Sequence, residues 1–228
     1  MSADRPSRIV LASASPRRRR LFAWFGVDYE VAPVDVDETP DPSLTDDPRA
    51  VAADIATRKA AAARTAHPDD VVVACDTVVV LDHEILGKPV DIDDAYRMLR
   101  SLSNRIHQVV TGVAVAIPGE PAAYNLSVVT NVHMHPLSQA DIVAWAEEGE
   151  LLGCAGAYNI ERHLAYVDDD ECYQNVAGLP LCHLYALLER VADGRLPRGL
   201  SRPDCACEAT RAVYCKLGPC MLGHRCCR

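Results

Sequence analysis

Aromatic residues and long apolar stretches are scarce in this chain of 228 residues. Phe, Trp and Tyr make up only 5% of it, so the core must be built mainly from aliphatic side chains. No apolar run approaches the roughly 20 residues that cross a bilayer, which predicts that the protein has no membrane partner. Residues 1–8 contain no apolar stretch typical of a signal peptide, so we expect a cytoplasmic protein.

Basic residues are also fewer than acidic residues. The chain has 23 Lys and Arg against 32 Asp and Glu, a formal net charge of −9. This balance argues against general nucleic-acid binding, which needs a basic surface. A local basic pocket in an acidic protein instead suits a small polyanion, with a divalent metal between acid and phosphate. The length allows one large domain or two small ones.

The ten cysteines are not expected to form a disulfide framework, because disulfides are rare in cytosolic proteins. Six of them crowd the C-terminal end: Cys205, Cys207, Cys215, Cys220, Cys226 and Cys227. We therefore divide the chain into a main domain, 1–195, and a Cys-rich extension of unknown role, 196–228. The extension has enough soft ligands for zinc or an iron–sulfur cluster, although its spacing fits no standard zinc signature. A disordered tail is the alternative, and both interpretations remain open.

A basic stretch near the start of the chain is the most informative motif. Residues 9–12 are apolar and typical of a buried strand, and Ser15, followed by proline, favours the start of a helix. Arg17 and Arg18 then lie in the first turn, where the helix dipole is already positive. A phosphate there would be met by backbone N–H groups, both guanidinium groups and the hydroxyl of Ser13. A solvated basic face is the alternative, but the order of strand, serines and helix favours an anion site.

Strands and helices alternate along the rest of the chain, which predicts an α/β fold with a mixed sheet. The expected strands cover residues 29–34, 71–81, 107–117, 122–133 and 164–167. The expected helices cover residues 49–66, 91–102, 138–149 and 183–191. Residues 153–158 are small and are expected to form a loop.

Asp76 is the sharpest catalytic candidate, because it interrupts an apolar strand. Burial of a carboxylate is costly unless a cation or donor meets it, and such a group suits a general base. A strand-end Asp that caps its own turn is the alternative. Glu38, in an acidic loop, could add an oxygen ligand for Mg²⁺, although a solvated loop fits equally well. Lys59 and Lys88 are natural phosphate partners, but a lone Lys usually faces solvent.

The order of these motifs resembles the Maf family of nucleoside triphosphate pyrophosphatases. The segments that carry the resemblance are 12–18 (ASASPRR), 36–38 (VDE), Lys59 in an Ala-rich helix, 75–78 (CDTV), 87–89 (GKP), 111–113 (TGV), 155–158 (AGAY) and 178–180 (GLP). The resemblance implies an elongated mixed sheet flanked by helices, with a central nucleotide-binding cleft of the Maf or ITPase-like kind. It also implies hydrolysis between the α- and β-phosphates, which yields a nucleoside monophosphate and pyrophosphate. A divalent metal cation, Mg²⁺ or Mn²⁺, and a homodimer are implied as well.

The resemblance assigns a role to each candidate residue. Asp76 would be the base that activates water, and Glu38 would help Asp76 to hold the metal. The triphosphate would be held by Ser13, Arg17, Arg18, Lys59 and Lys88.

Three positions bear on the choice of base. The branch of the family that acts on dTTP and UTP has an Arg, a Thr and a Gln at these positions, and this chain has Arg17, Thr77 and Glu161. The branch that acts on 7-methyl-GTP carries Glu at the third position but lacks the Arg and the Thr. Gln both donates and accepts hydrogen bonds, whereas ionised Glu only accepts. We expect dTTP and UTP as substrates, with 7-methyl-GTP or another modified nucleotide as the alternative.

Two functions of other kinds also fit this sequence. One is a nucleotide-binding regulator of cell division that does not turn its ligand over. The other is a hydrolase that removes the terminal phosphate. The combination of Asp76, Lys59 and Lys88 favours the pyrophosphatase over the regulator, because binding alone needs only a phosphate cradle.

Overall fold

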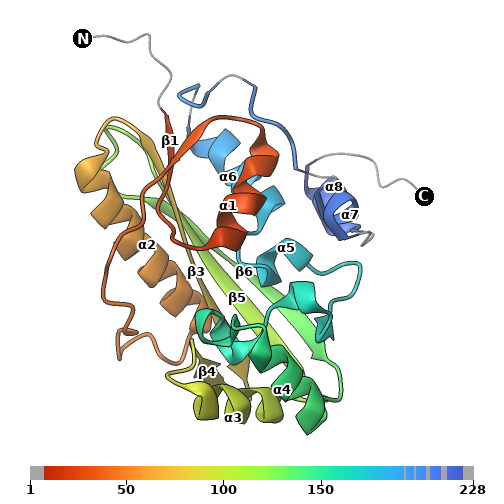
Figure 1. Cartoon of the computed structure of the whole chain (residues 1–228). Helices are drawn as coiled ribbons and strands as arrows, with labels where there is room; N and C mark the ends of the chain where they lie inside the picture. Colours follow the sequence, from red (N-terminus) through yellow and green to blue (C-terminus); the bar gives the residue numbers. More distant parts are fainter. Residues whose placement is uncertain (1–7, 193, 198, 204–205, 212–214, 223–228) are drawn as a thin grey trace.

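The computed structural model describes residues 8–192, 194–197, 199–203, 206–211 and 215–222. A seven-stranded mixed sheet with helices on both faces forms the molecule (Figure 1), which confirms the predicted α/β class. The strands are β1 (Ile9–Leu11), β2 (Tyr29–Val31), β3 (Val71–Leu81), β4 (Glu84–Leu86), β5 (Ile106–Ala116), β6 (Tyr124–Met134) and β7 (Ala165–Tyr166). The α-helices are α1 (Pro16–Phe22), α2 (Pro48–Ala66), α3 (Ile92–Leu102), α4 (Gln139–Glu147), α5 (Tyr173–Val176), α6 (Leu181–Val191), α7 (Ala206–Arg211) and α8 (Leu217–Met221). Short 3₁₀ turns are η1 (Ala23–Phe25), η2 (Leu151–Gly153), η3 (Ala155–Ala157) and η4 (Ile160–Arg162).

The strand order leaves a gap along one edge of the central strand. The sheet runs β2-β1-β3-β5-β6-β7, and β4 also pairs with β3. On the side of β3 away from β5, β1 pairs with residues 71–73 and β4 pairs with residues 79–81. No described strand pairs with residues 74–78 on that side. We call this segment the open edge of β3, and the predicted catalytic carboxylate lies in it.

Small residues allow α2 to lie directly on one face of the sheet. Ala56, Ala60 and Ala63 of α2 pack in one cluster with Val72 and Ala74 of β3. Because successive side chains of a strand point to opposite faces, the even-numbered positions of β3 face α2 and the odd-numbered positions face away. The side chains at 76 and 77 therefore enter the site from opposite faces of the sheet.

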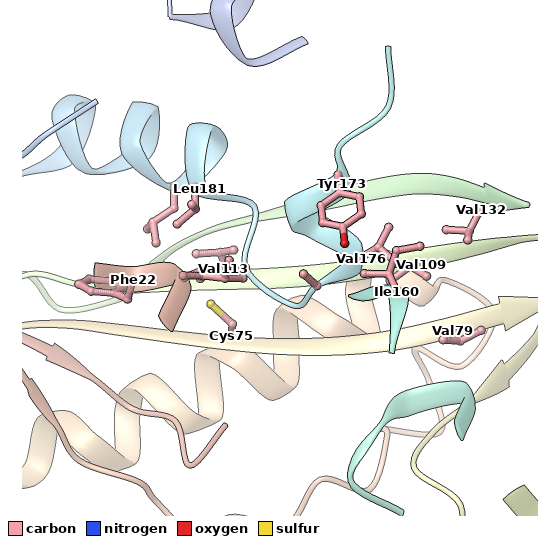
Figure 2. Close-up of a cluster of buried hydrophobic side chains, with 14 of the residues drawn as sticks. Phe22, Cys75, Val79, Val109, Val113, Val132, Ile160, Tyr173, Val176 and Leu181 are labelled. Atoms are coloured by element: carbon pink, nitrogen blue, oxygen red, sulfur yellow. The ribbon is translucent and has the colours of Figure 1, made fainter. Parts of the chain in front are cut away.

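The opposite face of the sheet carries the larger hydrophobic cluster. Phe22 of α1, Val113 of β5, Val176 of α5 and Leu181 of α6 are among its buried members (Figure 2). Cys75 points into this cluster from β3, one residue before the catalytic candidate. Helix α1, which carries the arginines, is therefore anchored in the main core through Phe22.

One loop prediction was wrong. Residues 153–158 were expected to form an irregular loop, but Gly153 ends η2 and the following residues form η3. The indole of Trp145 donates to the carbonyl of Ala157 at 2.7 Å, and the N–H of Gly156 donates to the carbonyl of Gly87 at 3.0 Å. These long-range bonds fix the turns, and sequence spacing alone does not reveal them.

The described parts of the C-terminal extension pack on the main domain. Cys207 and Ala206 are buried in the main hydrophobic cluster, and the N–H of Ser201 donates to the carbonyl of Phe25 at 2.7 Å. Lys216 forms an ion pair of 2.6 Å with Asp169. Within the part of the chain that the structure describes, no group of three or more His, Cys, Asp or Glu is placed to hold a metal ion. The cysteines at 205, 226 and 227 lie outside the described residues.

No described helix combines the length and the apolar character that crossing a membrane requires.

Candidate active site

The candidate active site is a cleft of about 550 Å³ beside the open edge of β3. The loop after β1, the first turns of α1, the middle of α2 and the η2–η3 segment all contribute to its walls. The predicted site residues that line it are Ser13, Arg17, Arg18, Glu38, Lys59, Asp76, Thr77 and Lys88. Glu161 is the one predicted site residue that is not part of this lining.

A chain of alternating charges occupies one end of the cleft. The ammonium nitrogen Nζ of Lys59 lies 2.7 Å from Oδ1 of Asp76 and 2.7 Å from Oε1 of Glu38. Nζ of Lys88 lies 3.1 Å from the second oxygen, Oε2, of Glu38. Lys59 and Asp76 are each only 7% exposed, so this pair is shielded from water. The structure thus brings together four residues that lie far apart in the sequence.

The two lysines determine the charge state of Glu38. Partial burial raises the pKa of its carboxyl group, but hydrogen bonds and charge from Lys59 and Lys88 outweigh burial and lower the pKa to about 2. Glu38 is therefore a carboxylate at neutral pH. Its two oxygens accept hydrogen bonds from different lysines, which holds it at the mouth of the site.

Lys59 has one donor left for a ligand. An ammonium group has three N–H donors, and two of them point at the carboxylates of Asp76 and Glu38. Small neighbours in α2, such as Ala56 and Ala60, bring the helix close enough to the sheet for the lysine stem to be buried.

The first turn of α1 has the predicted capping geometry. The hydroxyl of Ser15 accepts the N–H of Arg18 at 3.4 Å, and the hydroxyl of Ser13 accepts the N–H of Ser15 at 3.2 Å. Nη1 of Arg17 donates to the sulfur of Cys154 at 3.1 Å. The buried Nε of Arg17 has no hydrogen-bond partner among the described residues, so this guanidinium group has capacity for an anion.

Arg18 is already occupied by protein acceptors. Its Nε donates to the carbonyl of Gly178 at 2.8 Å, Nη1 to the carbonyl of Cys75 at 2.8 Å and Nη2 to the hydroxyl of Thr77 at 2.9 Å. The bond to Cys75 satisfies a carbonyl at the open edge of β3, where none of the described strands supplies a donor. Phosphate binding by Arg18 stays a prediction. In the structure, the side chain of Arg18 connects α1 to β3 and to the loop before α6 through these hydrogen bonds.

Thr77 belongs to a buried polar network. Its hydroxyl lies 2.9 Å from that of Thr111, which in turn donates to the carbonyl of Asn175 at 3.1 Å. The amide of Asn175 donates to the carbonyl of Val109 and to the hydroxyl of Thr130, both at 3.0 Å. This network holds Thr77 in place, so its predicted role in base selection would depend on α5.

Glu161 contacts the cleft through another residue. Its Oε2 lies 2.7 Å from Nη2 of Arg20, which does line the cleft. The sequence interpretation missed Arg20, although a helical signal was available. Arg20 follows Arg17 by three residues, and residues three apart lie on the same face of a helix.

Sequence reasoning also missed two cleft residues in the η2 region. Cys154 is buried, accepts from Arg17 and donates to the carbonyl of Glu150 at 3.2 Å. Hydrogen bonds from Asn159 and Arg162 lower the pKa of Glu150. No motif in the sequence distinguishes these residues from an ordinary loop.

Glu38 and Asp76 are chemically suited to a divalent cation. Mg²⁺ is commonly held by one or two carboxylates together with substrate phosphates and water. In this structure both carboxylates are drawn toward one cation, the ammonium of Lys59, so a positive charge already lies between them. The donor set fits a metal that arrives with a polyphosphate, and metal binding stays a prediction.

The fold and the cleft define the class of this protein. It is an α/β protein whose mixed sheet carries a candidate polyanion site, with arginines and lysines around a shielded carboxylate. Residues 8–191 match the family described as Maf-like protein, and the chain belongs to this family.

Several relatives are similar over most of their length. The chain is 42% identical over 186 residues to a dTTP/UTP pyrophosphatase of Geobacter sulfurreducens, covering 81% of this chain and 96% of that protein. It is 43% identical over 187 residues to a dTTP/UTP pyrophosphatase of Anaeromyxobacter dehalogenans, covering 80% and 93%. Among solved structures, the Ham1 protein of Staphylococcus aureus gives a TM-score of 0.42 at 19% identity, over 56% of this chain and 72% of that one. This structural likeness is too low to support any conclusion.

Proposed function

We propose that this protein is a nucleoside triphosphate pyrophosphatase that hydrolyses dTTP and UTP to the monophosphate and pyrophosphate. The observation that supports it best is the shielded Asp76 carboxylate, which lies in the same cleft as five cationic side chains from three parts of the chain. The names of relatives more than 40% identical to this chain support the substrate class.

The charged end of the cleft suits the triphosphate. A nucleoside triphosphate carries about four negative charges, and their neutralisation stabilises the charge that moves onto pyrophosphate as the bond breaks. Arg17, Lys59 and Lys88 supply positive charge, and Lys59 has a donor left after its two carboxylate contacts. Ser13 adds a hydroxyl beside the start of α1.

Asp76 is the proposed general base. Oδ1 accepts from Lys59, and no hydrogen bond to Oδ2 is found among the described residues. We assign Oδ2 as the atom that accepts a proton from the attacking water. The water oxygen then bonds to the α-phosphorus, and the bond between that phosphorus and the oxygen bridging to the β-phosphate breaks. The electron pair of that bond leaves with pyrophosphate. The ammonium of Lys59 fixes the orientation of the carboxylate during this step.

Glu38 and Asp76 are the residues that would hold the divalent cation, Mg²⁺ or Mn²⁺. When bound, such a cation neutralises phosphate charge and polarises the phosphoryl group. Glu38 is well suited because its low pKa keeps it ionised. A cytoplasmic location and a homodimer remain predictions from the sequence.

A product assay tests the proposed function. The purified protein is incubated with dTTP, UTP, CTP, 7-methyl-GTP and GTP, with Mg²⁺ or with a chelator, and pyrophosphate and orthophosphate are measured separately. We expect pyrophosphate from dTTP and UTP and little without the metal. Asp76→Asn should lower kcat by about 10²- to 10⁴-fold, as loss of a general base does. Asp82→Asn is the matched control, because Asp82 lies at an exposed turn outside the cleft lining.

Three results would contradict the proposal. Orthophosphate as the product would indicate cleavage of the terminal phosphate. Nucleotide binding without any product would favour a non-catalytic regulator. A preference for 7-methyl-GTP over UTP would favour the alternative substrate.

A further inference from the structure

The cleft has a second end whose chemistry differs from that of the charged end. Ser13, Glu38, Lys59, Asp76 and Lys88 gather where the polyphosphate is proposed to lie. The lining also includes Arg20 on α1 and a group of residues in and around the η2–η3 region: Gly149, Glu150, Gly153, Cys154, Ala155 and Tyr158. Small and aromatic residues suit a flat base, so the base of the nucleotide belongs at this end. This assignment rests on the proposed function.

Arg20 also lines the cleft at this end, and it has no role in the proposed phosphate site. Its Nη2 donates to Oε2 of Glu161 at 2.7 Å. The side chain of Arg20 is 61% exposed, whereas that of Glu161 is 18% exposed. Arg20 lines the cleft and Glu161 does not. The carboxylate thus lies behind the guanidinium group, which faces the open side.

The guanidinium group keeps donors for a ligand after this contact. No hydrogen bond to Nε or Nη1 of Arg20 is found among the described residues. An arginine has only donors, so it prefers a base that offers a carbonyl oxygen and disfavours one that offers an amino group. Thymine and uracil have a carbonyl at position 4, where cytosine has an amino donor.

We propose that Arg20 selects the base by donating to the O4 carbonyl of thymine or uracil, and that Glu161 is the positioning residue that holds its guanidinium group. A glutamate in this place then no longer argues against a pyrimidine substrate. One of its oxygens is taken by Arg20, and its charge is balanced there. Direct recognition of a methylated guanine by Glu161 is disfavoured, because Glu161 does not line the cleft and its Oε2 is held by Arg20.

The inference is tested with UTP and CTP, whose bases differ at position 4, a carbonyl against an amino group, and at the adjacent N3, an N–H against an unprotonated nitrogen. The kcat/KM ratio for UTP over CTP is measured by pyrophosphate release. The Kd ratio for UMP over CMP is measured by calorimetry, which needs no turnover. Arg20→Ala should lower the preference for uracil about tenfold in both ratios, since one base contact gives discrimination of this order. Arg20→Lys, which retains a donor, should lose less.

Glu161 should act only through Arg20. Glu161→Ala should weaken the preference for uracil in the wild-type background and leave it unchanged in the Arg20→Ala background. Arg19→Ala is the matched control, because Arg19 is an exposed arginine on the same helix that does not line the cleft. It should leave both ratios unchanged.

Two results would overturn the inference. The first is a change of less than about twofold in both ratios for Arg20→Ala, which is within the usual error of additivity. The second is a further change in preference when Glu161→Ala is added to Arg20→Ala, because Glu161 would then contact the base itself. A lack of pyrophosphate release from every nucleotide would refute the proposed function instead, and the monophosphate ratio would still decide the role of Arg20.

Discussion

Replacing Lys59 by methionine should separate the structural and the catalytic roles of the charged end of the cleft. The side chains of Lys59 and Asp76 are only 9% and 10% exposed, and their charged atoms lie 2.7 Å apart. Removing one partner of a buried pair leaves the other charge unpaired, at a typical cost of 3–5 kcal/mol. Because both groups keep some exposure, we expect Lys59→Met to lower the free energy of unfolding by about 3 kcal/mol. A domain of ordinary stability still folds after such a loss.

The double variant Lys59→Met/Asp76→Asn removes both charges. It should recover about 2 kcal/mol relative to Lys59→Met, because no carboxylate is then left unpaired beside the sheet. Asp76→Asn alone should cost less than Lys59→Met, since Lys59 keeps its 2.7 Å contact with Glu38. All three variants should release pyrophosphate at least about 100-fold more slowly than wild type. Restored stability without restored activity would show that the pair is needed for catalysis as well as for folding.

Urea unfolding at pH 7, followed by circular dichroism, measures these differences. Arg97→Met is the matched control, because it removes one cation from an exposed ion pair with Asp94 and should cost less than about 1 kcal/mol. The reasoning is refuted by a loss below about 1 kcal/mol for Lys59→Met, or by a double variant whose loss equals the sum of the two single losses.

Two further predictions concern the sheet that supports the site. Burial, with a smaller effect from the charge of His133, lowers the pKa of His107 from 6.5 to about 4, so His107 is neutral in the fold. The unfolded chain takes up this proton as the pH falls below 6.5, so His107 should contribute a loss of stability of about 2 kcal/mol between pH 7 and pH 5. Urea unfolding should show that the loss is smaller by this amount in His107→Gln than in wild type. Gly112→Ala should cost about 3 kcal/mol in thermal unfolding and also reduce activity, because a Cβ there would lie 2.2 Å from the backbone of Ala52 and push α2 off the sheet.

Each of these two predictions has a control within the same chain. His83→Asn changes an exposed histidine at the turn between β3 and β4, and it should leave the difference between pH 7 and pH 5 unchanged. Gly87→Ala adds a methyl group where no atom lies within 4 Å, so it should cost little. If His107→Gln retains the full pH dependence of the wild type, another group is responsible. If Gly112→Ala is no less stable than Gly87→Ala, α2 does not lie as close to the sheet as described.

Local chemistry in the sequence was sufficient for most of the secondary structure and for the candidate residues that gather in the cleft. Ser15 caps α1, as expected from a serine before proline. Gly26 ends η1 in the left-handed conformation, which glycine adopts readily. The apolar run around Asp76 became one strand, and the carboxylate did meet a cation, because a charge in such a place needs one. These features depend on neighbours in the chain or on the energetics of a single residue.

Only the tertiary structure determined which acceptor each arginine of α1 contacts. Arg17, Arg18 and Arg20 are equivalent in the sequence, yet one faces Cys154, one clamps the open edge of β3 and one pairs with Glu161, 141 positions away. These roles depend on where distant acceptors lie after the sheet has formed. A local pattern contains no information on those distances, because the strand order that sets them is fixed by packing across the whole chain.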